Sequence, residues 1–165
     1  MKKKSSCLII GLGKIGMGQK VNMINNNQFT HISTIKKHKK FELIGAIETD
    51  IKKRKIFENL QKKPCYKEIK DLPKNITVDL VVISSPTNTH LEITKKLLKY
   101  KKPKIILFEK PFSNSLKNAK KISTMCEKKE VKIFINYPRH TLPESLIVKT
   151  EIKNKNMKGK IIITN

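Results

Sequence analysis

Short runs of apolar residues recur along the chain, and most are followed by a polar segment long enough for a helix. Runs without polar alternation are typical of parallel strands that are covered on both faces. Strands that alternate with helices favour a parallel, doubly wound sheet. The sequence therefore predicts an α/β fold whose strands lie at residues 7–10, 41–47, 64–66, 78–83, 104–108 and 131–136.

The segments between these runs predict the helices. Thr30 is a candidate N-cap for a short helix that buries Ile32 and Ile35. Ser113 is the expected cap of a later helix, and consecutive asparagines disfavour a helix interior within 22–29, where we expect a loop. The expected helices cover about 31–39, 51–60 (with Ile51, Ile56 and Leu60 on its apolar face), the segment after His90 to Tyr100, 113–129 and 144–155, with one helical turn at 68–72.

The last residues differ from the rest of the chain. Residues 137–143 are expected to form a loop, and 159–165 reads as one apolar strand with no neighbour after it. Because a lone strand needs a partner, we expect the doubly wound sheet to form a first domain over 1–137. Residues 138–165 are then the start of a truncated second α+β domain.

The first apolar run leads directly into G-x-G-x-x-G. Gly11 would allow a tight turn, Gly13 would let backbone N–H groups approach a pyrophosphate, and Gly16 would let a helix pack on the strand. The N-terminus of that helix also attracts phosphate. A glycine-rich turn without a ligand is the alternative that this motif leaves open.

Glu48 follows the second predicted strand, where a carboxylate can accept hydrogen bonds from the adenosine ribose and repel a 2′-phosphate. This favours NAD over NADP. Glu48 stands 32 positions after Gly16, whereas about twenty is usual, and we attribute the excess to the loop at 22–29. Lys52, Lys53 and Arg54 could instead hold a phosphate, and Glu48 could be an ordinary surface carboxylate.

Two more strand ends belong to the same predicted edge of the sheet. Residues 84–88 offer backbone and small polar groups beneath a dinucleotide, and His90 follows as a capping, packing or functional histidine. Lys110 ends a central strand, where partial burial would lower its pKa and suit it to proton transfer on an alcohol or ketone. A cis bond at Pro111 would aim this lysine. A chance Glu-Lys pair before a turn is the alternative.

Composition changes this picture little. The formal charge is +24, but only two of the 37 basic residues are arginines, the residue preferred for reading phosphates and bases. A solvated basic surface is therefore expected rather than a specific nucleic-acid site. Three cysteines without a metal-binding spacing indicate reduced thiols. With no signal-peptide core and no apolar run of membrane-spanning length, we expect a cytoplasmic protein without a membrane or metal partner.

The segments GLGKIGMG, AIETD, SSPTNTH, FEKPFS and NYPRH follow successive predicted strands. In this order they resemble the Gfo/Idh/MocA oxidoreductases, above all members that act on sugars or polyols. The resemblance implies a Rossmann fold that binds NAD or, less favoured, NADP. It implies a cofactor site made by Gly11, Gly13, Lys14, Ile15, Gly16, Glu48, Ser84, Ser85, Pro86, Asn88, His90, Glu109 and Lys110.

The same resemblance implies that Lys110 is a catalytic or substrate-binding lysine and that Asn136 and Arg139 lie toward the substrate. The family's second domain supplies a catalytic histidine and an aspartate, and His140 does not match that position. We therefore expect an NAD(P)-dependent dehydrogenase of CH–OH groups in a sugar, sugar derivative or polyol, present as its cofactor-binding portion and inactive alone. The full-length form would be a homo-oligomer. A non-catalytic dinucleotide-binding module or an inactive fragment is the alternative.

Overall fold

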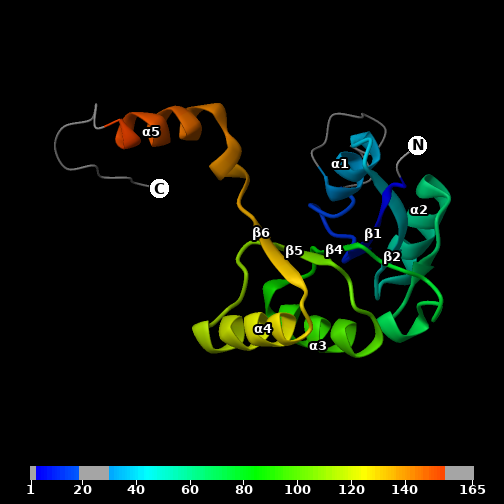
Figure 1. The fold of residues 1–165 in the computed structure, drawn as a ribbon. Coiled ribbons are helices and arrows are strands. Elements are labelled where there is room, and N and C mark those ends of the chain that lie inside the picture. Colours follow the sequence, from blue (N-terminus) through cyan, green and yellow to red (C-terminus); the bar gives the residue numbers. More distant parts are fainter. Residues whose placement is uncertain (1–2, 19–29, 155–165) are drawn as a thin grey trace.

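The structure, a computed structural model, describes residues 3–18 and 30–154 and contains one six-stranded sheet (Figure 1). Every neighbouring pair of strands is parallel, and the order is β3-β2-β1-β4-β5-β6. This order reverses between β1 and β4, which is where doubly wound sheets open a crevice for a ligand. The strands are β1 (Ser5–Ile10), β2 (Phe41–Ile47), β3 (Cys65–Tyr66), β4 (Leu80–Ile83), β5 (Ile105–Glu109) and β6 (Lys132–Asn136).

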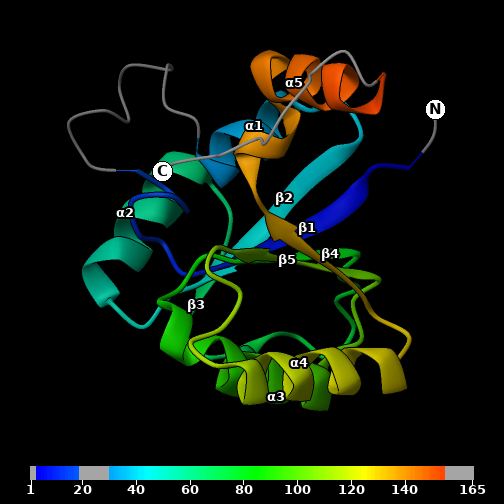
Figure 2. The same cartoon turned by 90° about the vertical axis from the view of Figure 1, so that its left-hand side faces the viewer.

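Helices cover both faces of this sheet, as Figure 2 shows: α3 and α4 lie on one face, and α1 and α2 lie on the other. The α/β, doubly wound fold predicted from the apolar runs is thus confirmed. The helices are α1 (His31–Lys37), α2 (Ile51–Gln61), α3 (His90–Tyr100), α4 (Leu116–Lys128) and α5 (Pro143–Lys153), with short 3₁₀ turns η2 (Ile69–Asp71), η3 (Thr87–Thr89) and η4 (Pro138–Thr141).

Alternate residues of β1 enter two separate cores. Leu8 packs in the core beneath α3 and α4, together with Phe108. Ile9 packs in the other core, together with Phe57 of α2. All four of these side chains are almost fully buried, so the first strand is apolar throughout because both of its faces are covered.

Several local predictions are confirmed and others are wrong. Thr30 caps α1 through a capping box with Ser33. The cap of α4 is Ser115 rather than Ser113, because the Ser115 hydroxyl accepts from the Asn118 amide. In α2 the buried residue is Phe57. Ile51 and Leu60 are exposed instead of forming the expected apolar face, and the strand expected at 159–165 lies outside the described residues.

The helix that follows the glycine loop is interrupted and then resumed. Residues 13–17 form a helical turn, closed by a 3.0 Å bond from the Met17 amide to the Gly13 carbonyl. The chain leaves the helix at Gly18, where φ is +98°, and returns at α1. There the His31 amide donates to the Ile15 carbonyl at 3.0 Å, as the next residue of an unbroken helix would.

This return is in register for a second residue as well, because the Ile32 amide donates to the Gly16 carbonyl at 3.2 Å. Residues 19–30 are therefore an insertion of 12 positions within one helix. Setting them aside leaves Glu48 about 20 positions after Gly16, the usual separation for this kind of site. The insertion is longer than the loop at 22–29 that the sequence indicated.

At the amino ends of the strands, Asp79 connects β1, β4 and β5. One carboxylate oxygen accepts from the amide and the hydroxyl of Ser6, and the other pairs with the Lys104 ammonium at 2.8 Å. The Lys104 ammonium and the Ser6 amide hold the pKa of Asp79 at about 2, below its ordinary value of 3.8. This cluster stabilises the amino ends of β1, β4 and β5, away from the crevice.

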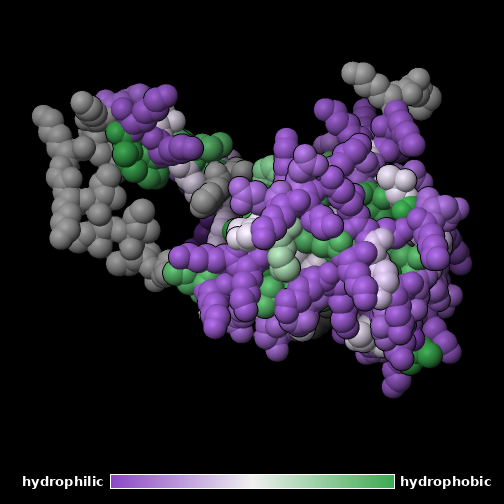
Figure 3. All heavy atoms as spheres, turned by 60° about the horizontal axis from the view of Figure 1, so that its bottom comes forward, coloured by the Kyte–Doolittle hydropathy of each residue, from purple (hydrophilic) through white to green (hydrophobic). Residues whose placement is uncertain are grey.

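The surface is largely polar. Over α3 and α4 the exposed face is mostly hydrophilic (Figure 3). Helix α5 projects away from the sheet (Figure 1) and has no buried residue. Among the residues that the structure describes, no helix is long and apolar enough to cross a membrane.

Candidate functional site

The carboxyl ends of the strands open onto one cavity of about 1120 Å³. This is large for a small-molecule site and lies where open α/β sheets bind their ligands. The glycine loop after β1, the end of β2, the loop after β4 and the ends of β5 and β6 all contribute to its lining. The predicted site residues on it are Gly11, Gly13, Lys14, Ile15, Glu48, Ser84, Ser85, Pro86, Glu109, Lys110 and Asn136.

The three glycines of the loop have different roles. Gly11 has a φ of +95°, and a Cβ there would lie 2.7 Å from the Ser85 amide nitrogen. A Cβ on Gly16 would overlap the Gly11 carbonyl oxygen. These two positions thus let the loop pack against its own helical turn and against the loop after β4.

Gly13 is the exception, because a Cβ there would meet no atom of the described residues within 4 Å, its own chain neighbours aside. Its position on the cavity is therefore open space that a side chain would fill. Such a vacant approach to backbone N–H groups is what a pyrophosphate needs. The residues present accordingly fit the phosphates of a dinucleotide.

Glu48 ties the end of β2 to the glycine loop. Its Oε2 accepts from the Leu12 amide at 2.7 Å, and its Oε1 accepts from the Asp50 amide at 3.1 Å. The carboxylate is thus fixed beside the loop while it lines the cavity. It has remaining lone pairs for ribose hydroxyls.

The cations considered as phosphate ligands are placed differently from one another. Arg54 donates from Nη1 to the carbonyls of Glu48 and Thr49, at 2.8 and 2.7 Å, so this nitrogen holds the end of β2. Lys53 lines the cavity, whereas Lys52 is exposed.

The loop after β4 packs against the glycine loop. The Ser84 hydroxyl donates to the Gly11 carbonyl at 2.8 Å, and the Ser85 hydroxyl bonds to that of Thr89 at 2.8 Å. Pro86 precedes η3. Asn88, within η3, is not part of the cavity lining formed by the described residues.

His90 is buried rather than placed on the cavity. It is 1% exposed, and its two ring nitrogens lie 3.0 Å from the Phe112 carbonyl and 3.1 Å from the Ser85 carbonyl. His90 therefore connects the loop after β4 with the loop after β5. Contact with a cofactor through this side chain stays a prediction.

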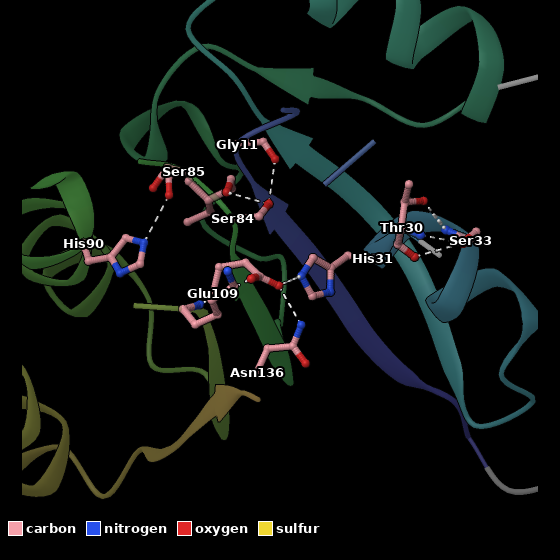
Figure 4. A network of polar contacts seen from close by, with 11 residues as sticks. Gly11, Thr30, His31, Ser33, Ser84, Ser85, His90, Glu109 and Asn136 are labelled. Carbon is pink, nitrogen blue, oxygen red and sulfur yellow. Dashed lines mark hydrogen bonds and ion pairs between the residues drawn. The ribbon is translucent and has the colours of Figure 1, made fainter. Parts of the chain in front are cut away.

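Glu109 is the centre of a polar network on the cavity wall (Figure 4). His31 and Asn136 both point toward it, and both bond to the same carboxylate oxygen, Oε1, at 2.7 and 2.6 Å. These contacts join the start of α1, the end of β5 and the end of β6.

Lys110 reaches the cavity from the end of β5, but it is exposed. This exposure differs from the partial burial expected from the sequence. The peptide bond from Lys110 to Pro111 is cis. Arg139, in η4, is exposed, and no described part of it lines the cavity.

Sequence reasoning missed several cavity residues. His31 is the most informative, since it was treated only as the first residue of a short helix. Its place three positions after Gly16 becomes visible only when 19–30 are recognised as an insertion. Other cavity residues to which the sequence assigned no role in the site are Thr30, Thr34, Lys67, Glu68, Lys96 and Pro138.

Among the described residues, neither a metal site nor a reactive cysteine has support. No three His, Cys, Asp or Glu side chains there come together as metal ligands. Cys7, Cys65 and Cys126 are buried and unpaired. Burial raises the pKa of Cys65 to about 12 and that of Cys7 and Cys126 to about 11, so these thiols are poor nucleophiles.

Comparison with known proteins identifies the family of this chain. The family model of the Gfo/Idh/MocA proteins, described as an oxidoreductase family with an NAD-binding Rossmann fold, matches residues 5–137. An uncharacterized oxidoreductase of Schizosaccharomyces pombe is 30% identical over 120 residues, which are 70% of this chain and 31% of that protein. The myo-inositol 2-dehydrogenase of Thermotoga maritima is 28% identical over 133 residues, 79% of this chain and 35% of that protein.

Solved structures show the same fold. The WlbA dehydrogenase of Chromobacterium violaceum, solved with NADH and UDP-GlcNAcA, has a TM-score of 0.78 at 17% identity. The match covers 93% of this chain and 41% of that one. The myo-inositol 2-dehydrogenase of Lactobacillus plantarum has a TM-score of 0.74 at 19% identity, over 97% of this chain and 44% of that one.

The parallel sheet and the cavity at its carboxyl edge place this protein among the Rossmann-fold dinucleotide-binding proteins. The match to the family model then identifies the family. The chain belongs to the Gfo/Idh/MocA oxidoreductase family and carries its NAD-binding Rossmann fold. It spans about a third of the length of the curated relatives that it matches.

Proposed function

We propose that this chain is the cofactor-binding portion of an NAD-dependent dehydrogenase that acts on a CH–OH group of a sugar, sugar derivative or polyol. One observation carries the proposal: Gly13, Glu48 and Lys110 open onto the same cavity. Relatives named as myo-inositol dehydrogenases and a structure solved with a nucleotide sugar support the substrate class.

The two ends of the cavity hold different halves of the dinucleotide in this proposal. The glycine loop binds the pyrophosphate through its backbone N–H groups, and Glu48 accepts from the adenosine ribose. The loop after β4 and the end of β5 then face the nicotinamide half. When bound, NAD accepts a hydride from the substrate carbon.

Lys110 is the proposed catalytic residue. Lys110 lines the cavity at the proposed nicotinamide end. There it orients the substrate oxygen and exchanges a proton with it. Because Lys110 is exposed, an element beyond the described residues must exclude water for efficient proton transfer.

Glu48 supports NAD over NADP, because a carboxylate fixed beside the ribose repels a 2′-phosphate. Arg54, the strongest candidate for holding that phosphate, directs Nη1 to backbone carbonyls. Lys53 and Lys67 are further cations of the cavity lining in the described chain.

The proposal extends to organisation and location. The family match ends at residue 137, and α5 exposes Leu146, Ile147 and Ile152, which supports 138–165 as the start of a second domain. Association of full-length copies through that domain is part of the proposal. The three unpaired cysteines support a reducing compartment such as the cytoplasm.

A non-catalytic NAD-binding module is the second candidate. The exposure of Lys110 favours it, because water at the cavity competes with a substrate for this side chain.

Calorimetric titration with NAD and NADP tests the binding proposal, with tighter binding of NAD expected. Equal binding of both would contradict the role given to Glu48. Reduction of NAD in the presence of myo-inositol and other polyols, measured at 340 nm, separates the two candidates. Binding without turnover in a longer form of the protein would favour the module.

A further inference from the structure

Three polar side chains from distant parts of the sequence meet on the wall of the cavity. His31 opens α1, Glu109 ends β5 and Asn136 ends β6, and all three line the cavity. Figure 4 shows His31 and Asn136 converging on one carboxylate oxygen. A carboxylate only accepts hydrogen bonds, so the proton of His31 is on Nε2, and Asn136 donates through Nδ2.

The orientation of Glu109 depends on these two donors. Its side chain is 12% exposed and that of His31 is 11% exposed, so the carboxylate has little water to solvate it. Its other oxygen meets only the Lys110 amide, at 3.3 Å, among the described contacts. No lysine or arginine of the described chain forms an ion pair with Glu109, since its partner there is His31.

His31 owes its place to the in-register return of the interrupted helix. Its amide takes the position that would follow Gly18 in an unbroken helix, through the bond to Ile15. The capping box of Thr30 and Ser33 fixes the first turn of α1 around it. Both features hold the imidazole over the end of β5.

We propose that His31, with Asn136, is a positioning residue for the nicotinamide half of the dinucleotide site. It acts through Glu109 by fixing the strand end that carries Lys110. The inference rests on the proposed function, because it takes NAD as the ligand. The adenosine half is held at the glycine loop and Glu48, so removal of His31 is expected to affect the two halves unequally.

The test compares NAD with ADP, which lacks the nicotinamide half. Calorimetric titration of His31→Leu should show NAD binding weakened about tenfold, as expected if roughly a tenth of the molecules keep the strand end in its binding-competent position, with ADP binding unchanged. His31→Gln keeps an N–H donor and should recover most of the affinity for NAD. His38→Leu is the matched control, because His38 is an exposed histidine at the other end of α1.

Asn136→Leu carries the same expectation and serves if His31→Leu does not fold. Combining both changes should weaken NAD binding less than the two separate losses would add up to, since both donors act on one oxygen. Unchanged NAD binding in His31→Leu and Asn136→Leu would overturn the inference, as would equal losses for NAD and ADP. If the unaltered chain binds neither ligand, the proposed function itself fails.

Discussion

Gly13 and Gly16 allow the dinucleotide site to be tested separately from the fold. A side chain at Gly13 enters open space, whereas one at Gly16 overlaps the Gly11 carbonyl. Gly13→Val should therefore keep its stability, whereas Gly16→Ala should fold but be destabilised. Because replacing glycine restricts the unfolded chain, the stability of Gly13→Val should stay within about 1 kcal/mol of the unaltered protein.

The effect of Gly13→Val on binding is expected to be large. The valine side chain fills the space through which a phosphate approaches the loop amides. Hydrogen bonds to a charged group contribute about 1.5–3 kcal/mol each. Loss of two of them weakens binding by at least about a hundredfold.

Thermal unfolding and calorimetric titration with NAD provide the two measurements. The expected pattern is an unchanged Tm with binding lost for Gly13→Val. For Gly16→Ala we expect a Tm lowered by several degrees, because a backbone atom must move. Normal NAD affinity in Gly13→Val would refute the phosphate-loop interpretation, and unfolding of that variant would refute the open space around Gly13.

Three further predictions follow from other parts of the molecule. Lys110→Met should retain NAD affinity in this chain and abolish turnover in a longer active form; normal turnover would remove Lys110 from the mechanism. Because the pKa of Asp79 is lowered on folding, its stabilisation is complete above about pH 4 and is lost as the pH falls toward 2. Above this pH range, the free energy of unfolding of Asp79→Asn should be lower than that of the unaltered protein by about 1 kcal/mol, a value reduced for solvent screening. Below this range the two free energies should become equal. Deletion of 19–30, joining Gly18 to His31, should preserve the fold and NAD binding, as circular dichroism and titration would show.

Much of the fold could be predicted because the apolar runs are continuous. Burial on both faces of β1, β4 and β5 leaves a signal that depends on local sequence alone. The capping box at Thr30 is equally local. The apolar face of α2 was harder to predict, because only Phe57 is buried and charged residues dominate the helix.

The candidate site was predictable where it depends on motifs and not where it depends on distant contacts. The glycine loop and Glu48 were found because each follows a strand directly. The contact of His31 with Glu109 joins residues 78 positions apart, and the insertion conceals the spacing that would have indicated it. The exposure of Lys110 depends on which elements cover the strand end, and spacing carries no information about that.

The interrupted helix also defines a place where this domain can accept foreign sequence. The chain leaves the helix at Gly18 and returns at His31, which takes the position of the next residue in the same helix. The fold there constrains register and not length, so a guest polypeptide with closely spaced ends could replace 19–30. A fluorescent reporter placed at this junction, beside the phosphate loop, would make the domain an optical sensor of its own cofactor.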